Sequence, residues 1–254
     1  MAADTLVILT GASRGLGQAM AAQYLADGAF VLGLSRRESN ALKPSGTGGL
    51  EQWPADLADA LPVAERLGAW LGDFERRAGG RLPPRVRVIH NAAMISEPGD
   101  VAASAPDDLA RSLRIGLEAP VALTAAFLRA TGHWAASDRR VLFVSSGLGR
   151  RPMAGAAAYC AQKAGLDHFA RALALEEGAR PHGARVASVA PGIIDTDMQK
   201  QLRGADPGRF AAQGTFAGFH SSGTLDSPAT AAARMIALLE RADYGAEPVA
   251  DVRG

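Results

Sequence analysis

The stretch AAYCAQKAG, residues 157–165, carries a phenol and an ammonium group in an alanine-rich setting. The chain has only three tyrosines and three lysines, yet Tyr159 and Lys163 stand four positions apart. On a helix this spacing puts both side chains on one face, within reach of a common ligand. A nearby positive charge lowers the pKa of a phenol from its usual value of about 10. We therefore expect proton transfer at Tyr159; the alternative is a helix surface without a catalytic role.

A glycine-rich stretch, TGASRGLG at residues 10–17, begins at the end of the first apolar run of the chain. Glycines at positions 11, 15 and 17 allow the backbone to turn tightly and to approach a pyrophosphate. Free amides at the start of the next helix would stabilise the phosphate charge. A tight turn without a ligand also favours glycine, but the position after the first strand favours nucleotide binding.

Basic residues lie where the adenosine ribose of a dinucleotide would be. The second expected strand ends near Ser35, and Arg36 and Arg37 follow it, while Arg14 lies in the glycine-rich turn. An acidic residue there would bind a free ribose hydroxyl, whereas guanidinium groups suit a 2′-phosphate. The pattern predicts NADP rather than NAD; the alternative for Arg37 is a solvated loop position.

Five apolar runs indicate the strands that must position these groups, with mostly helical stretches between them. The runs are TLVILT (5–10), AFVLGLS (29–35), VRVIHN (86–91), RRVLFVSS (139–146) and ARVASVAP (184–191). Near-continuous apolar runs are typical of parallel strands covered by helices on both faces. The sequence thus predicts a Rossmann-type, doubly wound α/β sheet within a single domain, residues 1–254. Residues 43–49 and 77–85 are expected to form loops.

The composition favours a small-molecule partner. Lys and Arg total 27 against 26 for Asp and Glu, and no block of like charge indicates nucleic-acid or membrane binding. The five histidines are scattered, so we expect no metal. The single cysteine, Cys160, excludes an internal disulfide and is expected to be a packing residue rather than a reactive thiol. With no apolar run long enough to span a membrane, we expect a cytoplasmic protein.

Several motifs in order resemble the short-chain dehydrogenase/reductase family: the glycine-rich turn, ADL at 55–57, HNAA at 90–93, and PGIIDT at 191–196. Ser146 stands thirteen residues before Tyr159, as in that family. The segments AYCAQKAGLDHFAR, APGIIDTDMQ and GTLDSPATAAARMIALLE resemble the branch that contains sepiapterin and benzil reductases. The resemblance implies the catalytic residues Ser146, Tyr159 and Lys163. It implies cofactor contacts at Gly11, Ser13, Arg14, Gly15, Leu16, Gly17, Arg36, Arg37, Asp56, Leu57, Asn91, Ala92, Tyr159, Lys163, Pro191, Gly192, Ile194 and Thr196.

This resemblance implies an NADPH-dependent carbonyl reductase whose substrate is a ketone or vicinal diketone, with an aromatic one expected. Tyr159 would be the general acid, Ser146 would bind the carbonyl oxygen, and Lys163 would bind the nicotinamide ribose. The alternatives are a secondary-alcohol dehydrogenase and a weakly catalytic NADP-binding sensor or scaffold. A homodimer or homotetramer would form through the helix at about 105–131 and the helix that carries Tyr159.

Two further expectations concern the substrate and one concerns a departure from the family. Residues 197–225 contain Phe210, Phe216 and Phe219 and would cover the cleft as a lid; the alternative is ordinary packing of a helical pair. Asp251 would either anchor the substrate or serve a structural role. Gly116 stands where the family usually has Asn, whose backbone carbonyl holds a water of the proton relay. We expect glycine to keep the local helix distortion through backbone freedom; the alternative is an impaired relay.

Overall fold

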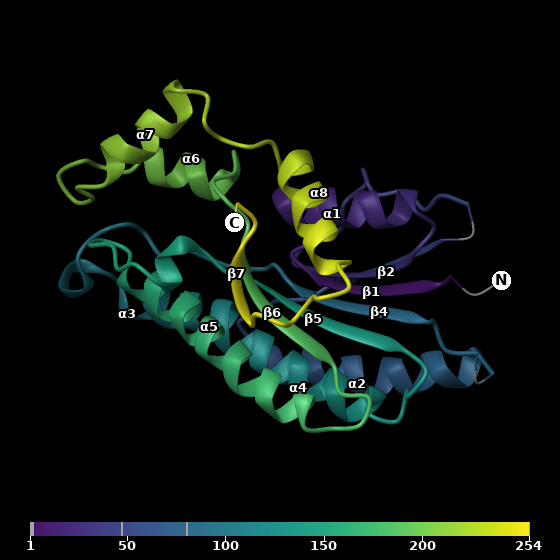
Figure 1. The fold of residues 1–254 in the computed structure, drawn as a ribbon. Coiled ribbons are helices and arrows are strands. Elements are labelled where there is room, and N and C mark those ends of the chain that lie inside the picture. Colours follow the sequence, from purple (N-terminus) through teal and green to yellow (C-terminus); the bar gives the residue numbers. More distant parts are fainter. Residues whose placement is uncertain (1–2, 47, 80, 254) are drawn as a thin grey trace.

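A parallel β-sheet forms the centre of the computed structural model, which describes residues 3–46, 48–79 and 81–253 (Figure 1). Its strand order is β3-β2-β1-β4-β5-β6-β7, and every pair of neighbours is parallel. The strands are β1 (Thr5–Thr10), β2 (Phe30–Ser35), β3 (Gly49–Pro54), β4 (Arg85–His90), β5 (Asp138–Val144), β6 (Arg185–Ala190) and β7 (Val249–Asp251). The doubly wound α/β fold expected from the sequence is confirmed.

Helices cover both faces of this sheet. Figure 1 shows α1 and α8 on one face, and α2, α4 and α5 on the other. A separate buried apolar cluster lies on each side of the sheet. The α-helices are α1 (Gly15–Ala26), α2 (Ala60–Arg77), α3 (Pro106–Leu113), α4 (Ala119–Thr131), α5 (Ala157–Gly178), α6 (Asp197–Arg203), α7 (Gln213–Ser221) and α8 (Pro228–Leu239). Shorter helical turns are η1 (Val101–Ala103), η2 (Arg114–Glu118) and η3 (Gly147–Gly149). Within the described ranges, no helix is long and apolar enough to cross a membrane.

The two edge strands are not among the five apolar runs. The outer strand β3, with the sequence GLEQWP, has one sheet neighbour and buries mainly Trp53. Its Glu51 carboxylate accepts hydrogen bonds from the indole nitrogens of Trp53 and Trp70, so polar residues are compatible with this strand. At the opposite edge, β7 is only three residues long. Residues 47 and 80, which fall in the two expected loops, lie outside the described residues.

The parallel sheet brings distant sequence motifs to one edge. The glycine-rich turn follows β1, Asn91 follows β4, Ser146 comes shortly after β5, and Pro191 follows β6. Because parallel strands end at the same edge, these residues line the region where doubly wound folds bind ligands. Figure 1 shows α6 and α7 as a helical pair apart from the two main layers, linked to α8 by a long connection.

Candidate active site

The turn after β1 has the close backbone packing that its glycines predict. Gly11 and Gly15 have φ angles of +74° and +56°, which L side chains rarely adopt. A Cβ atom at Gly17 would overlap the Gly11 carbonyl oxygen and the Asn91 amide. Asn91 in turn donates from Nδ2 to the carbonyl oxygens of Thr10 and Gly11, at 3.1 and 3.2 Å. The motif after β4 therefore fixes the shape of the turn after β1.

The basic residues differ in the partners they have. Arg36 and Arg37 are exposed at the end of β2, and neither forms an ion pair within the part of the chain that the structure describes. Arg14, also exposed, instead lies 2.7 Å from Asp197 Oδ2. Asp56 accepts hydrogen bonds from the Ala58 amide and the Arg111 guanidinium, and both lower the pKa of its carboxyl group. The guanidinium groups of Arg14, Arg36 and Arg37 are thus all exposed, and of the three only Arg14 forms an ion pair within the described residues.

The structure brings Ser146, Tyr159 and Lys163 together at the carboxyl edge of the sheet. Tyr159 lies in the first turn of α5, next to Ser146, and Lys163 lies one turn further on. The Lys163 ammonium donates to the Val144 carbonyl oxygen at 2.7 Å and is 5.5 Å from the centre of the Tyr159 ring. Tyr159 and Lys163 are 8% and 2% exposed. This arrangement provides a shielded proton donor, a hydroxyl and a buried cation.

The expectation that Lys163 lowers the pKa of Tyr159 is wrong for the protein by itself. Burial raises the pKa of Tyr159 to about 12, and the hydrogen bond with Ser146 opposes this only in part. Burial also lowers the pKa of Lys163 to about 8, against the attraction of the Asp167 carboxylate. Removal from water disfavours both charged groups, and this outweighs the effect of their neighbours. Tyr159 is therefore protonated at neutral pH, as a proton donor must be.

The loop after β6 returns to the glycine-rich turn. Gly192 has a φ angle of +86°, and Ile194 forms a parallel bridge with Asp226. Thr196 Cγ2 lies 3.5 Å from the position that a Cβ atom at Gly15 would occupy. The PGIIDT motif thus lies against the start of α1, as its predicted cofactor role requires.

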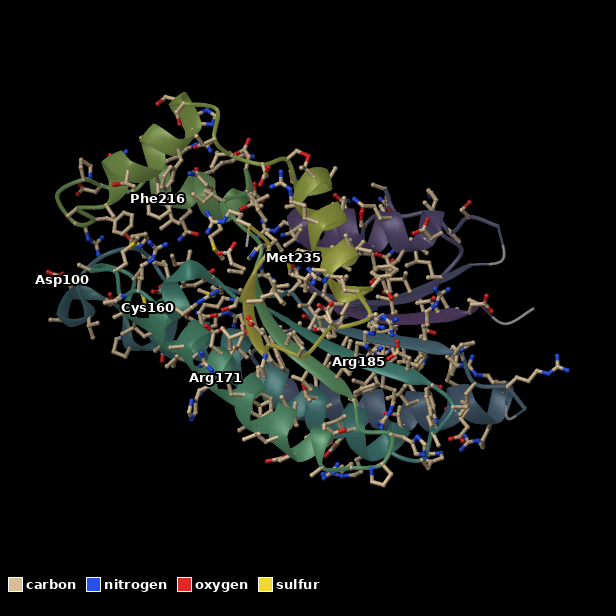
Figure 2. The ribbon with its side chains drawn as sticks, in the orientation of Figure 1. Asp100, Cys160, Arg171, Arg185, Phe216 and Met235 are labelled. Carbon is tan, nitrogen blue, oxygen red and sulfur yellow. The ribbon has the colours of Figure 1, made fainter. Side chains whose placement is uncertain are left out.

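Residues 197–225 pack against Tyr159. Phe210 is fully buried in an apolar cluster that includes Tyr159, Ile95 and Leu202, with Phe216 packed against it. The Phe210 and Phe216 rings are 5.8 Å apart, and Phe219 contacts Phe216 edge to face. In Figure 2, Phe216 on α7 and Cys160 on α5 lie at the same end of the molecule, and both pack against this cluster.

Ion pairs connect this segment to other parts of the chain. Arg209 pairs with Glu97 at 2.7 Å, next to the loop that carries Gly99, and Asp197 pairs with Arg14 at 2.7 Å. Asp251, the other residue considered for substrate contact, has both carboxylate oxygens engaged by the Arg253 guanidinium. The ion pair with Arg253 explains the position of the Asp251 carboxylate without a bound ligand.

Gly116 lies in a π-helical turn, η2, that interrupts the helix between Pro106 and Thr131. The distortion expected at this position is therefore present. A Cβ atom at Gly116 would overlap the side-chain amide of Gln162, which is fully buried. The Gln162 amide nitrogen donates to the Met94 carbonyl oxygen at 2.9 Å and to Ser112 Oγ at 2.8 Å. Gln162 thus fills the space that the missing side chain leaves.

Another buried group without a predicted role is His90, at the end of β4. Its ring stacks on Phe143 with centroids 5.1 Å apart, and its Nε2 atom lies 2.8 Å from Thr124 Oγ1. Burial lowers the pKa of His90 to about 3. The ring is therefore neutral in the folded protein near neutral pH.

His90 is expected to make the fold acid-sensitive. Its folded pKa of about 3 lies below the unfolded value of 6.5, so its contribution to stability is present above pH 6.5 and is lost as pH falls toward 3. The free energy of unfolding should decrease by about 1.4 kcal/mol per pH unit in this window because of this group. Urea denaturation of wild type and His90→Asn at several pH values measures the difference in slope. Parallel pH dependences would refute the assignment.

Comparison with known proteins decides the family. The model of the short chain dehydrogenase family matches residues 5–207, which include the glycine-rich turn, all three candidate catalytic residues and the loop after β6. The chain belongs to the short-chain dehydrogenase family. This confirms the relationship that the motifs predicted.

Individual members of the family are similar over most of the chain. A benzil reductase that forms (S)-benzoin, from Bacillus cereus, is 32% identical and the match covers 94% of this chain and 95% of the relative. A sepiapterin reductase from Bos taurus is 34% identical, with 78% and 76% covered. The predicted branch is therefore confirmed.

Solved structures of the family match as well. A short-chain dehydrogenase/reductase from Burkholderia vietnamiensis is 34% identical with 99% of each chain covered and a TM-score of 0.65. An NAD(P)-dependent dehydrogenase from Beutenbergia cavernae, solved with NADP bound at low occupancy, is 26% identical. There the match covers 98% of this chain and 95% of that one, with a TM-score of 0.78.

Sequence reasoning missed Gln162 and Asp167 as parts of the site. Asp167 follows Lys163 by four residues, as Lys163 follows Tyr159, so the helical spacing that singled out the first pair also included it. Gln162 lies off that face and has no such signal. Its role depends on the glycine at position 116, which lies on another helix.

Proposed function

We propose that this protein is an NADPH-dependent carbonyl reductase. The observation that carries the proposal is the joint placement of Ser146, Tyr159 and Lys163 at the carboxyl edge of the sheet, the edge at which the glycine-rich turn also lies. A protonated phenol beside a hydroxyl suits the reduction of a carbonyl group, whose oxygen must gain a proton. The benzil and sepiapterin reductases among its relatives support the same chemistry.

The residues at the site fit a dinucleotide. Cβ atoms at Gly11 and Gly17 would collide with Asn91 and the backbone of the turn, so only glycine allows this tight turn before α1. The first turn of α1 presents backbone amides that have no partners within the helix, which suits a pyrophosphate. Lys163, at the same edge of the sheet, would hold the nicotinamide ribose. When bound, NADPH would supply the hydride.

The residues of this chain then have distinct tasks. Ser146 donates a hydrogen bond to the carbonyl oxygen of the substrate, which stabilises the negative charge that develops there. Tyr159 gives its phenolic proton to the same oxygen. The positive charge of Lys163 stabilises the phenolate that remains until Tyr159 is reprotonated. The low exposure of Tyr159 and Lys163 limits the access of competing water.

An aromatic ketone or vicinal diketone is the proposed substrate class. The lid proposed for residues 197–225 is supported by the apolar cluster in which Phe210 and Tyr159 pack together. Initial rates of NADPH oxidation with aryl diketones, aryl ketones, quinones, pterins and small aliphatic ketones test this assignment. We expect the highest specificity constants for aryl diketones; equal values for aliphatic and aromatic ketones would overturn it.

The cofactor preference is expected to favour NADPH over NADH by at least about tenfold in dissociation constant, since a charge-assisted hydrogen bond contributes roughly 1.5–3 kcal/mol. Arg36→Ala should remove most of this preference by weakening NADPH binding alone. Arg171→Ala, which changes an exposed arginine on α5, is the control and should leave both affinities unchanged. Equal affinities in the wild type, or no effect of Arg36→Ala, would refute the phosphate assignment.

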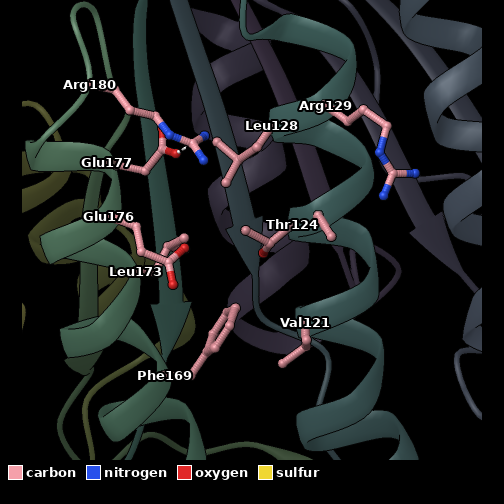
Figure 3. Close-up of a pocket in the computed structure, with 10 residues that line it drawn as sticks. Val121, Thr124, Leu128, Arg129, Phe169, Leu173, Glu176, Glu177 and Arg180 are labelled. Atoms are coloured by element: carbon pink, nitrogen blue, oxygen red, sulfur yellow. Dashed lines mark hydrogen bonds and ion pairs between the residues drawn. The ribbon is translucent and has the colours of Figure 1, made fainter.

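A homodimer is the proposed assembly, with a tetramer as the alternative. A groove of about 350 Å³ lies between α4 and α5 (Figure 3), with Val121, Leu128, Phe169 and Leu173 among its lining residues. On α5, Leu175 is 78% exposed, so it is available for contact with a second copy of the chain. Light scattering at micromolar concentration should give twice or four times the chain mass, and Leu175→Asp should shift it toward the monomer. A monomeric wild type would exclude both assemblies.

A further inference from the structure

A buried carboxylate lies beneath the catalytic set. Asp167 is only 1% exposed, and its Oδ1 atom accepts hydrogen bonds from Ser145 Oγ at 2.6 Å and Ser188 Oγ at 2.7 Å. Its Oδ2 atom has no hydrogen-bond partner among the described residues and lies 3.6 Å from Arg150 Nε. A buried charge with so few partners is costly to a fold, so its presence calls for an explanation.

The partners of Asp167 belong to the elements that carry the active site. Ser145 directly precedes Ser146, and Ser188 lies on β6, which leads to the loop of Pro191. Arg150 follows η3 and also donates to the Ala250 carbonyl oxygen on β7, at 3.2 Å. Asp167 itself lies on α5, one helical turn beyond Lys163. One carboxylate therefore joins β5, β6 and α5 at the point where the catalytic groups meet.

We propose that Asp167 is a positioning residue of the active site, which keeps the Lys163 ammonium charged and fixes the end of β5 that carries Ser146. The catalytic half of this inference rests on the proposed reductase function. The charge of Lys163, in contrast, is a property of the protein alone and can be measured without turnover.

The groups around Lys163 indicate that Asp167 is the carboxylate that stabilises its charge. On α5 the ammonium faces the neutral ring of Tyr159, and from β5 it meets only the carbonyl oxygen of Val144. Arg150, which follows η3, is a second cation and lies 3.6 Å from Asp167, so it contributes no negative charge near Lys163. Asp167 is the charged group that raises the pKa of Lys163 against the effect of burial. Without Asp167, the buried ammonium of Lys163 would lose the carboxylate that favours its charged form.

The small number of lysines makes a direct test practical. Protein grown with isotopically labelled lysine has only three lysine signals, from Lys43, Lys163 and Lys200, and Lys163→Met identifies the middle one. A pH titration by NMR should give Lys163 a pKa near 8 in the wild type. In Asp167→Asn that value should fall by at least about one pH unit, since an opposite charge nearby shifts a pKa by 1–3 units.

Asp138→Asn is the matched control, because it removes a carboxylate from an ion-pair network at the opposite end of β5. It should leave the Lys163 titration unchanged. If Asp167→Asn does not fold, Asp167→Ser serves the same purpose, because its short hydroxyl carries no charge and needs fewer partners. A Lys163 titration in either variant that coincides with the wild type would overturn the electrostatic part of the proposal.

The pH dependence of kcat for the holoenzyme tests the second part of the proposal, that Asp167 supports catalysis. In Asp167→Asn the alkaline limb should move to lower pH by the same amount as the Lys163 titration, and kcat at neutral pH should fall at least about tenfold. If the Lys163 pKa shifts in Asp167→Asn but the pH dependence of kcat does not, the catalytic part of the proposal is overturned. A wild type without turnover would refute the reductase function, while the NMR result would still decide the charge of Lys163.

Discussion

Tyr159→Phe is expected to lower turnover by at least about a hundredfold, because a positioned general acid typically contributes a factor of 10²–10⁴. Phenylalanine keeps the ring that packs with Phe210 and Leu202, so the fold and the apolar surface of the site remain. Only the phenolic hydroxyl beside Ser146 is lost. The dissociation constant for NADPH, measured by fluorescence titration, should stay within about twofold of the wild type.

Tyr244→Phe is the matched control for this loss of a buried phenol. Tyr244 is 4% exposed and donates to the Val141 carbonyl oxygen at 2.7 Å, away from the catalytic set. Its replacement should reduce stability by about 1 kcal/mol through the lost hydrogen bond while leaving turnover intact. If Tyr159→Phe retained more than a tenth of wild-type turnover, another proton donor would have to be sought.

Gly116→Asn is expected to destabilise the protein by about 3 kcal/mol, although Asn is the usual residue of the family at this place. The new side chain would collide with the buried Gln162 amide, and overpacking of a core typically costs 1–3 kcal/mol. Displacing Gln162 would also break its hydrogen bonds to Met94 and Ser112. Urea denaturation measures this loss, and turnover of the folded variant should fall rather than rise.

Two further variants test whether the loss of stability comes from the collision with Gln162 or from replacing a helical glycine as such. Gly116→Asn with Gln162→Ala should recover at least about half of the lost stability, because removing the amide leaves room for the new side chain. Gly72→Asn, on α2 with open space around it, should change stability by no more than about 0.5 kcal/mol. A hundredfold gain in turnover for Gly116→Asn would instead indicate an impaired proton relay in the wild type.

The central strands and the order of the motifs were predictable because each depends on residues close together in the sequence. Apolar runs identify β1, β2, β4, β5 and β6, since strands buried on both faces leave little room for polar side chains. The edge strand β3 has no such run: its polar Glu51 is stabilised by the indole groups of Trp53 and Trp70. That stabilisation comes partly from α2, a different element, and is invisible to local patterns.

Within the site, the same distinction separates what could be predicted from what could not. Tyr159, Lys163 and Asp167 share one helical face, so their spacing is visible in the sequence. The fit of Gln162 against Gly116 depends on a π-helical turn in another helix. The pairing of Arg14 with Asp197 likewise joins residues 183 positions apart. Burial raises the pKa of Tyr159, and the cluster around it joins residues far apart in the sequence, such as Ile95 and Phe210, so a nearby lysine alone suggested the wrong direction.

Steady-state reduction of an aryl vicinal diketone tests the central claim most directly. Wild-type protein, NADPH and benzil should give saturable NADPH oxidation, with one hydroxyketone formed for each NADPH consumed. The same mixture with Tyr159→Phe should bind NADPH and show at most about a hundredth of that rate. Tight NADPH binding by the wild type, with no oxidation above background across the carbonyl panel, would contradict the account. The protein would then be an NADP-binding protein without reductase activity.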